Sequence, residues 1–474
     1  MIASISWKNI WRNKLRSSIV IGSVAMGVMC GTFIMALMNG MVYERIESAI
    51  KNETAHIKIT LPSYDKDEDV SKTIDADSAI IAQLYNIPDI KSVSARTKLS
   101  VMASSAKANT GFVLSGINPK AEKQVSEIYR FIKDSMGSFF GKEMVNPIVI
   151  SEKTAKDLKF DFYSIDSISL IKLKEGKIPD SVLAILQSTE KQLFKSKKIF
   201  LDYLYKHLRS DDYYEYKDQI LKKTIHFALG KRIEITLRSV TGKEMRDVFR
   251  VVGIFKTSNG MFDQMNAFAL NADLLHLTEL RADQCHEIAI MCKNEKVVDS
   301  VVAKIKKRFP QFTVKTWLQI QPESGMMAGM TDLYNIVFMS LILFALGFGI
   351  VNTMLMTVLE RVKELGMLMA IGMNRRKVYL MLLFETIYLC LTGGFIGMIL
   401  GYCIVTATAS GISLEMFAEG FESLGYASVI YPLIDTRFYV EVTILVVCTG
   451  IIASLYPARK AINLKPAEAL HTDI

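Results

Sequence analysis

The sequence predicts an α+β membrane protein, with four transmembrane helices and a large mixed α/β extracytoplasmic domain between the first and second helices. Two observations predict this fold. Four apolar runs are each long enough to cross a hydrocarbon core, which takes about 20 helical residues. Residues 41–332, between the first two runs, are too many for a loop and alternate in places like a sheet. Half of the residues are apolar, yet 22% are charged, so both lipid-facing and water-facing parts are expected.

The predicted segments follow one another along the chain. They are a cytoplasmic amphipathic elbow helix (1–17), a transmembrane helix (18–40), the periplasmic domain (41–332), a second transmembrane helix (333–359), a cytoplasmic coupling helix (360–377), a third transmembrane helix (378–407), a periplasmic loop (408–437), a fourth transmembrane helix (438–457) and a cytoplasmic tail (458–474).

The distribution of basic residues predicts the orientation. The formal net charge of +9 could indicate a nucleic-acid binder, but the basic residues cluster beside the apolar runs. The positive-inside rule then places both termini and the second connection in the cytoplasm, so the basic excess reflects topology. The basic residues are Lys8, Arg12, Lys14 and Arg16 before the first run, Arg361, Lys363, Arg375, Arg376 and Lys377 in the second connection, and Arg459, Lys460 and Lys465 after the last. The connection at 410–435 instead carries Glu415, Glu419, Glu422 and Asp435, without Lys or Arg.

The N-terminal residues 3–16 predict an amphipathic helix on the inner membrane surface. The following run, 18–38, is longer than a typical signal-peptide core and no small-x-small cleavage pattern follows it, so an uncleaved anchor is expected. The apolar side chains would face lipid and the basic ones the headgroups. The apolar set is Ile5, Trp7, Ile10, Trp11 and Leu15, and the basic set is Lys8, Arg12 and Arg16.

The periplasmic domain begins and ends with strand-like patterns. Alternation at 56–61 and 93–101 predicts strands, and the turn-rich residues 106–111 predict a hairpin into 112–117. A second hairpin is expected where Thr241-Gly242 turns the chain back into 248–255. Between about 160 and 228, apolar residues recur at helical spacing and predict an insertion with one or two helices. This insertion could dock a partner or pack on the sheet, and the sequence does not choose between the two.

Residues 352–385, NTMLMTVLERVKELGMLMAIGMNRRKVYLMLLFE, join two apolar runs through a charged turn. Such a turn must lie in water or against another protein, because unpaired charges in lipid are costly. The irregular spacing of its apolar residues favours a short interfacial helix that ends near Gly372 or Asn374 over a strand. The order N-T-[ML]-x-M-x-V-x-E-R-x-x-E-[LI]-G-[MI]-L-x-A-[IL]-G resembles the permease subunits of the MacB, FtsX and LolC/LolE group of ATP-binding-cassette systems. The outer strands resemble that family more loosely, and residues 160–228 depart from it.

The resemblance implies a role for this segment and for the chain's partners. It would be the coupling helix that docks on a cytoplasmic ATPase dimer, through Glu360, Arg361, Glu364, Leu365, Gly366, Ala370 and Gly372. ATP and magnesium would bind to that ATPase and no cofactor to this chain, since no G-x-x-x-x-G-K-[ST] phosphate loop occurs. The other implied partners are a second permease copy or a paralogue, a lipoprotein cargo and a periplasmic carrier protein. The location would be the bacterial inner membrane.

Three functions fit this resemblance. The first is a LolC/LolE-type permease that extracts lipoproteins from the outer leaflet of the inner membrane and passes them to the carrier. The second is a MacB-like permease for export of a periplasmic substrate, although MacB proteins usually carry a fused ATPase. The third is an FtsX-like activator of a cell-wall hydrolase, although the outer domain of FtsX is usually much smaller. The lipoprotein function is the leading hypothesis.

Several residues within the apolar runs are candidates for helix packing or for lipid contact. Small residues every four positions predict close helix contacts, and Glu385 in the third helix is expected to be hydrogen bonded to another helix, with proton coupling as an alternative. Flexible, polarizable Met side chains at the outer ends suit acyl chains, although Met is abundant throughout, with 25 in all. The glycines are Gly27 and Gly31 (with Ser23), and Gly393, Gly397 and Gly401. The methionines are Met38 and Met41 after the first helix, and Met326, Met327 and Met330 leading into the second.

Catalytic and metal-binding motifs are missing from the sequence pattern. The His residues are scattered without metal-ligand spacing, so no catalytic residue and no metal site is expected. Cys285 and Cys292 are predicted to lie on opposite faces of one strand, too far apart for a disulfide.

Overall fold

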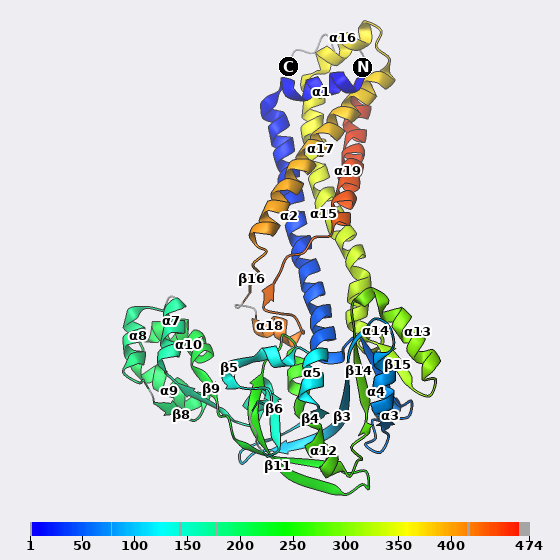
Figure 1. Ribbon diagram of the computed structural model, residues 1–474. Coiled ribbons are helices and arrows are strands. Elements are labelled where there is room, and N and C mark those ends of the chain that lie inside the picture. Colours follow the sequence, from blue (N-terminus) through cyan, green and yellow to red (C-terminus); the bar gives the residue numbers. More distant parts are fainter. Residues whose placement is uncertain are drawn as a thin grey trace. The chain divides into compact units, whose positions relative to one another are not determined.

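The computed structural model describes residues 2–76, 78–141, 145–176, 178–190, 192–414 and 418–463, so Glu415 and Lys465 of the charge pattern lie outside the described residues. The chain forms two compact units. We call Met1–Ile46, Glu323–Ala418 and Ala427–Ile474 the helical unit, and Glu47–Pro322 with Glu419–Tyr426 the large domain. Figure 1 shows the elements of both.

Among its described residues, the helical unit has four helices that are long and apolar enough to cross a membrane. This confirms the predicted fold class of a mixed α/β domain inserted between the first two of four long apolar helices. The helices of this unit are α1 (Ile2–Arg12), α2 (Lys14–Ser48), α15 (Pro322–Glu360), α16 (Val362–Ala370), α17 (Arg375–Ala407) and α19 (Thr436–Ile462), with a small sheet of β16 (Ile412–Ser413) and β17 (Val429–Ile430). Two shorter helices, α1 and α16, precede α2 and α17 along the chain.

Two of the long helices extend beyond the expected spans. Helix α2 continues through the π-helical turn η1 (Ala49–Thr54), well past residue 40. Helix α15 begins at Pro322, although the sequence predicted a start at 333. Met326, Met327 and Met330 therefore lie within this helix, and the expectation that they precede it was wrong. Apolar length alone marks the lipid-crossing part of a helix, whereas hydrogen bonding continues through polar residues outside it.

The large domain is built on a sheet that closes on itself. The strand order is β10-β11-β6-β12-β4-β3, and the end of β3 pairs again with β10, which makes a ring around an apolar core. The first half of β3 pairs instead with β14, and β1 and β15 extend the sheet over a second core. The strands are β1 (Ile57–Thr60), β3 (Ile90–Ser104), β4 (Asn109–Ile117), β5 (Ile132–Gly137), β6 (Pro147–Ser151), β10 (Arg232–Arg238), β11 (Glu244–Phe255), β12 (Asn266–Leu270), β14 (Glu287–Cys292) and β15 (Thr313–Thr316).

Shorter elements cover this sheet and connect its strands. They are α3 (Tyr64–Asp67), β2 (Ile74–Asp75), α4 (Ser78–Tyr85), α5 (Pro119–Val125), η2 (Ile128–Phe131), α6 (Glu152–Asp157), α11 (Gly260–Met265), α12 (Asn271–Thr278), β13 (Gln284–Cys285), η3 (Glu295–Val297), α13 (Val298–Arg308), α14 (Trp317–Ile320) and α18 (Ala418–Ser423).

Both predicted hairpins are confirmed. Strands β3 and β4 pair from Thr97↔Gly116 to Ser104↔Asn109, and β10 and β11 pair from Arg232↔Arg250 to Arg238↔Glu244. At the second turn Gly242 has φ +80°, a left-handed conformation that favours glycine.

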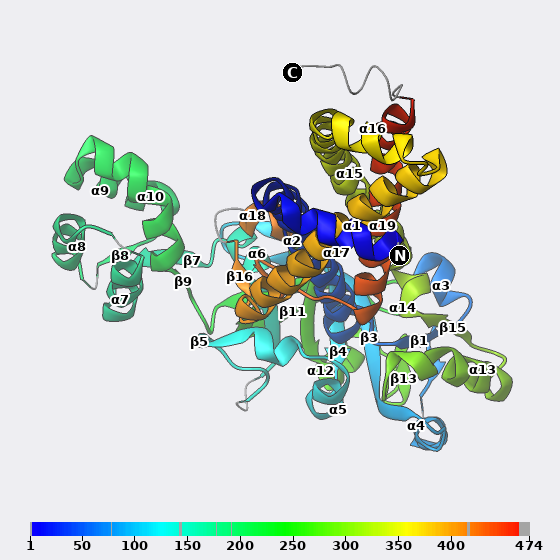
Figure 2. The ribbon, with the colours of Figure 1, turned by 90° about the horizontal axis from the view of Figure 1, so that it is seen from above.

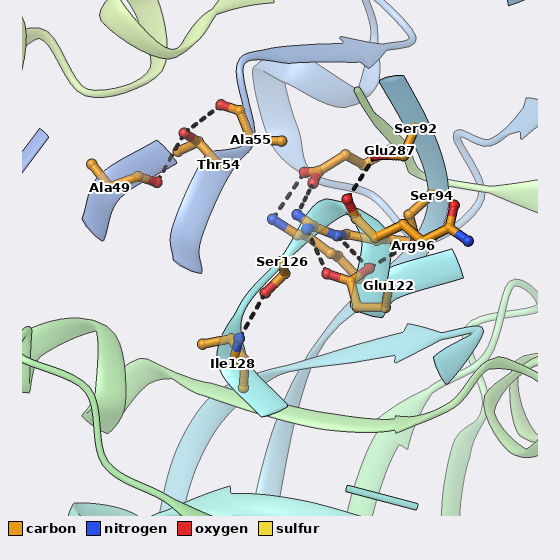
Figure 3. Close-up of polar contacts among 12 residues, drawn as sticks. Ala49, Thr54, Ala55, Ser92, Ser94, Arg96, Glu122, Ser126, Ile128 and Glu287 are labelled. Carbon is orange, nitrogen blue, oxygen red and sulfur yellow. Dashed lines mark hydrogen bonds and ion pairs between the residues drawn. The ribbon is translucent and has the colours of Figure 1, made fainter. Parts of the chain in front are cut away.

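A buried ion network fixes α5 to the sheet. Figure 3 shows the Arg96 guanidinium of β3 between the carboxylates of Glu122 and Glu287, at 2.7 and 3.1 Å. Ser94 also donates to Glu122, at 2.7 Å. Burial opposes ionisation of Glu287, but Lys98, Lys58 and Arg96 hold its pKa below the usual range. Because every charge has a partner, the network locks one arrangement of helix and strands.

The insertion contains more helices than predicted. The sequence indicated one or two helices, but the structure has α7 (Ser167–Glu175), α8 (Asp180–Gln187), α9 (Lys197–His207) and α10 (Ser210–Thr224) around the sheet β8-β7-β9, which enclose their own apolar core (Figure 2). The strands are β7 (Asp161–Ser164), β8 (Leu193–Phe194) and β9 (Ile225–Phe227). The side chains of Asp166 and Ser196 cap the N-termini of α7 and α9, so these residues mark where separate helices begin within the insertion.

The prediction that Cys285 and Cys292 lie on opposite faces of one strand was wrong, although both are free thiols. Both side chains are buried in the same core cluster. They belong to two strands, β13 and β14, separated at His286, and the pairing of β14 shifts register between Met291 and Cys292. The strict alternation of a single strand therefore does not apply across them.

Candidate functional site

The connection between α15 and α17 forms a short helix, α16, within the segment predicted to couple to an ATPase. It begins after Arg361 and ends where Gly372, with φ +100°, turns the chain. Asn374 then caps α17 by accepting a hydrogen bond from the Arg376 amide, at 3.1 Å. Gly372, which ends α16, and Asn374, which caps α17, therefore limit the turn between the two helices to a few residues.

The inner face of α16 packs on the helical unit itself. Leu365 is fully buried and Gly366 is also buried, in a cluster with Val358, Val378 and Ala458. These two predicted coupling residues therefore support the helix from inside and present no surface for a partner. The physical reason is the helical period, which turns every third or fourth residue inward.

The outer face of α16 is exposed and partly apolar. Met367 is 53% exposed and Ile371 is 78% exposed. Ala370, Gly372 and Lys363 are exposed as well. An apolar side chain with this exposure at the end of a charged turn is a candidate contact for another protein.

Among the charged residues predicted to couple to the ATPase, Arg361 and Glu364 form ion pairs within the chain. Arg361 Nη1 lies 3.3 Å from both carboxylate oxygens of Glu385 in α17, and its Nε lies 3.1 Å from Glu364. Arg361 and Glu385 side chains are only 13% and 5% exposed. The expected helix-to-helix hydrogen bond of Glu385 is thus made by the first residue before α16, a partner that the sequence pattern did not name.

Helix α1 lies against the same segment. Arg12 of α1 pairs with Glu364, and Arg16, in the first turn of α2, pairs with Glu360. The hydrogen bond from Arg12, together with that from Arg361, holds the pKa of Glu364 below its ordinary value. Figure 1 shows α1 running crosswise to the long helices, beside α16.

The N-terminal helix was expected to place all its apolar side chains in lipid and its arginines at headgroups. That expectation was wrong for Ile10, which is 1% exposed in the helical core, and the structure divides residues 3–16 between α1 and α2. Ser6 Oγ donates to the Met381 carbonyl at 2.9 Å, and the Trp7 ring meets Tyr388 edge to face. A matching signal existed in the sequence: Arg12 and Arg16 are four residues apart, and so are Glu360 and Glu364.

The glycine positions lie at close contacts between long helices. A Cβ on Gly397 would lie 2.6 Å from the Ala25 carbonyl oxygen, and one on Gly393 would lie 2.8 Å from that of Ile21, so α17 and α2 approach backbone to backbone. A Cβ on Gly401 would lie 2.9 Å from the side-chain carbons of Thr32 on α2. On α2, Gly27 meets Leu346 of α15 and Gly31 meets Met339.

The two methionine clusters lie at different levels along the helices. Asn335 of α15 donates to Asn39 of α2 at 2.9 Å, beside Met38 and Met41. Met326 is nine residues before Asn335, or about 13 Å along the helix axis. The extra turns of α15 therefore separate the two clusters along the helices. Met326 remains 69% exposed, Met330 46% and Met38 39%, while Met41 and Met327 are partly buried.

Two curated relatives are similar to part of this chain. An uncharacterized ABC transporter permease of Methanocaldococcus jannaschii is 29% identical over 228 residues, which cover 47% of this chain and 54% of that protein. The macrolide export ATP-binding/permease protein MacB of Chlorobium luteolum is 35% identical over 122 residues, covering 26% of this chain and 16% of MacB. The chain thus spans about half the length of the first relative and far less of MacB.

Among solved structures, the extracellular domain of the noncanonic ABC-type transporter YknZ from Gram-positive bacteria matches 55% of this chain and 99% of that chain, with 14% identity and a TM-score of 0.28. The model of the FtsX-like permease C-terminal family matches residues 336–466. This range runs from α15 through α16 and α17 to α19, and it includes the Arg361–Glu385 pair. The chain therefore carries an FtsX-like permease domain.

Proposed function

We propose that the chain is a permease subunit of the MacB/FtsX type, and that α16 docks on a separate cytoplasmic ATPase. The observation that carries the proposal is the exposed apolar end of α16, Met367 and Ile371, on a helix whose opposite face is buried in its own unit through Leu365 and Gly366. An ATPase groove would bury these side chains, while Arg361 and Glu385 would pass the force to α17. The named ABC permease and MacB relatives support the same assignment.

The orientation belongs to this proposal. Docking requires α16 and both termini to lie in the cytoplasm, which agrees with the basic clusters, and the large domain would then be extracytoplasmic. The location in a bacterial inner membrane and the second permease copy remain predictions.

The test is co-purification of the ATPase with full-length variants. Ile371→Asp should reduce the bound ATPase at least about tenfold, because a central apolar contact is replaced by a charge. Leu229→Asp, at a 41% exposed apolar position of the large domain, is the matched control. Ile371 is a cleaner target than Glu364, whose reversal would also break the contacts with Arg12 and Arg361. Full ATPase binding by a membrane-inserted Ile371→Asp protein would contradict the proposal.

Lipoprotein extraction is the second candidate, because Met38, Met326 and Met330 offer exposed, flexible apolar side chains on neighbouring helices. A photo-crosslinking residue at position 326 should then capture lipoprotein acyl chains. Capture of phospholipid alone would favour export of another substrate, and capture of a cell-wall hydrolase activator would favour the FtsX-like function.

A further inference from the structure

The large domain has a surface cleft where β10 and β11 lie side by side. Its volume is about 700 Å³, and its lining comes from four places along the chain: the end of β3, the residues just before β6, the start of β10 and the middle of β11. A cleft of this size suits a small organic ligand. The side chains that line it indicate what the chemistry of that ligand would be.

Two arginines stand opposite each other in this lining. Arg232 of β10 pairs with Arg250 of β11 in the strand register, so both side chains lie on the same face of the sheet, with their Cβ atoms about 5 Å apart. Both side chains are exposed. Like charges in directly opposite positions repel each other and weaken the pairing of the two strands. One oxyanion that accepts from both guanidiniums would remove this repulsion.

The carboxylates on the same face are occupied elsewhere. Among the described residues, neither the Arg232 nor the Arg250 guanidinium has an ion-pair or hydrogen-bond partner. The two glutamates of this face contact Arg246 instead, with Nη2 2.7 Å from Glu244 Oε1 and Nη1 3.8 Å from Glu234 Oε1. Arg232 and Arg250 therefore keep donors that a bound anion can use.

The wall of the cleft beside β6 is fixed by hydrogen bonds. Asn146 donates from Nδ2 to Asp247 Oδ2 at 2.7 Å, and its carbonyl accepts from the Arg250 amide at 2.9 Å. The other carboxylate oxygen of Asp247 accepts from the Val248 amide, at 2.7 Å. The Asp247 carboxylate is thus engaged within the wall, and it does not neutralise the two arginines.

The opposite wall is the end of β3. Ser105 Oγ accepts from the amides of Lys107 and Ala108, both at 3.1 Å, which fixes the turn that follows this strand. Ser104, one residue earlier, lies opposite Glu234 in the register of β3 and β10, on the same face as the arginines. Its half-buried hydroxyl lines the cleft and offers a third donor to an anion.

Apolar side chains lie beside these donors. Val145 is 79% exposed and Val248 is 45% exposed, and both line the cleft. Val248 lies opposite Glu234 in the register of β10 and β11, two residues from Arg250. The two valines would cover an apolar part of a ligand, while the Glu234 carboxylate would repel a second negative charge.

We propose that this cleft binds a small amphipathic anion. A single oxyanion, such as a carboxylate, would lie between Arg232 and Arg250, and an apolar body would lie against Val145 and Val248. The assignment goes beyond the proposed function and does not depend on an ATPase docking at α16, so either proposal can fail while the other stands.

The first measurement uses the full chain in nanodiscs of phosphatidylcholine, with empty nanodiscs as the blank. The probe is 2-naphthoate, which joins one carboxylate to an apolar ring system, and isothermal titration calorimetry measures its binding. We expect one saturable site per chain, and at least tenfold weaker binding of the uncharged 2-naphthamide. Absence of a saturable site, or equal binding of the two probes, would overturn the proposal.

Substitution of the arginines tests the position of the anion. Arg250→Gln and Arg232→Gln should each weaken binding of 2-naphthoate about tenfold, because each removes charged donors. Neither should lower the unfolding temperature, since each removes a repulsion between opposite residues. Arg238→Gln, at an exposed position on the same face of β10 but outside the cleft, is the matched control. An equal loss of affinity in Arg238→Gln and Arg250→Gln would overturn the site.

Two further variants test the ligand chemistry. Glu234→Gln should tighten binding of 2-naphthoate at least threefold, because it removes a negative charge beside the anion, and misfolding does not produce such a gain. Val248→Ser should weaken binding, because the apolar contact is lost. Unchanged affinity in Glu234→Gln would contradict an anion at this place. Displacement of 2-naphthoate by an equal concentration of inorganic phosphate would overturn the assignment to an amphipathic ligand.

Discussion

Arg361 Nη1 lies 3.3 Å from both carboxylate oxygens of Glu385, and this pair joins the turn before α16 to the body of α17. The pair is nearly enclosed, and Arg361 also contacts Glu364 at 3.1 Å. It gives a physical route by which a push on α16 reaches a long helix, and it explains why a carboxylate stands in an apolar run.

The first prediction concerns this pair. Glu385→Gln should destabilise the helical unit by about 1–3 kcal/mol, because the largely buried guanidinium of Arg361 loses its buried carboxylate partner and keeps only the more exposed Glu364. The double variant Arg361→Met/Glu385→Met should lose less than either single variant, since no unpaired charge remains. Thermal unfolding of the full chain in detergent measures both, with Arg375→Met at an exposed position as the control. Losses that simply add would show that the two residues do not interact.

The second prediction concerns the contact between α17 and α2. Gly397→Ala should destabilise the helical unit by about 1–3 kcal/mol, because the new methyl group would lie 2.6 Å from the Ala25 carbonyl oxygen and the helices must move apart. Gly349→Ala in α15, where a Cβ would meet nothing within 4 Å, should be neutral or slightly stabilising. Equal effects of the two substitutions on the unfolding temperature would argue against close backbone packing at Gly397.

The third prediction concerns pH. Burial raises the pKa of Asp263 to about 7, against the opposing effects of the Thr257 hydrogen bonds and Lys256, while nearby Glu152 adds to the rise. A raised pKa means that the folded state binds the proton more tightly than the unfolded state. This contribution to stability is complete below the unfolded value of 3.8 and is lost as the pH rises through about 7.

Asp263→Asn, which keeps a neutral acceptor for Thr257, should therefore gain stability relative to the wild type by about 1–3 kcal/mol between pH 4 and pH 8. Unfolding temperatures of the full chain across this range measure the difference. Asp157→Asn, at an exposed position, serves as the control. A difference between wild type and Asp263→Asn that stays constant with pH would contradict the assignment.

The sequence by itself determined the fold class and marked the charged turn between the second and third apolar runs. A long apolar run predicts a helix that can cross lipid, and alternating apolar and polar residues predict a strand. A charged turn between two such helices must face water or protein. Each of these features can be read from neighbouring residues in the sequence. The hairpins at Ala106–Gly111 and Thr241–Gly242 follow from the same local rules.

Only the tertiary structure decided which partner each side chain meets. Arg12 and Glu364, or Glu53 and Asn259, are brought together by chain folding across hundreds of residues, and no local pattern encodes that approach. For the same reason, the inward direction of Leu365, the burial of Ile10 and the offset of the methionine clusters followed from packing. The order of apolar and polar residues indicates whether a segment can form a helix or a strand. Which side chains that helix or strand contacts depends on how the rest of the chain packs around it.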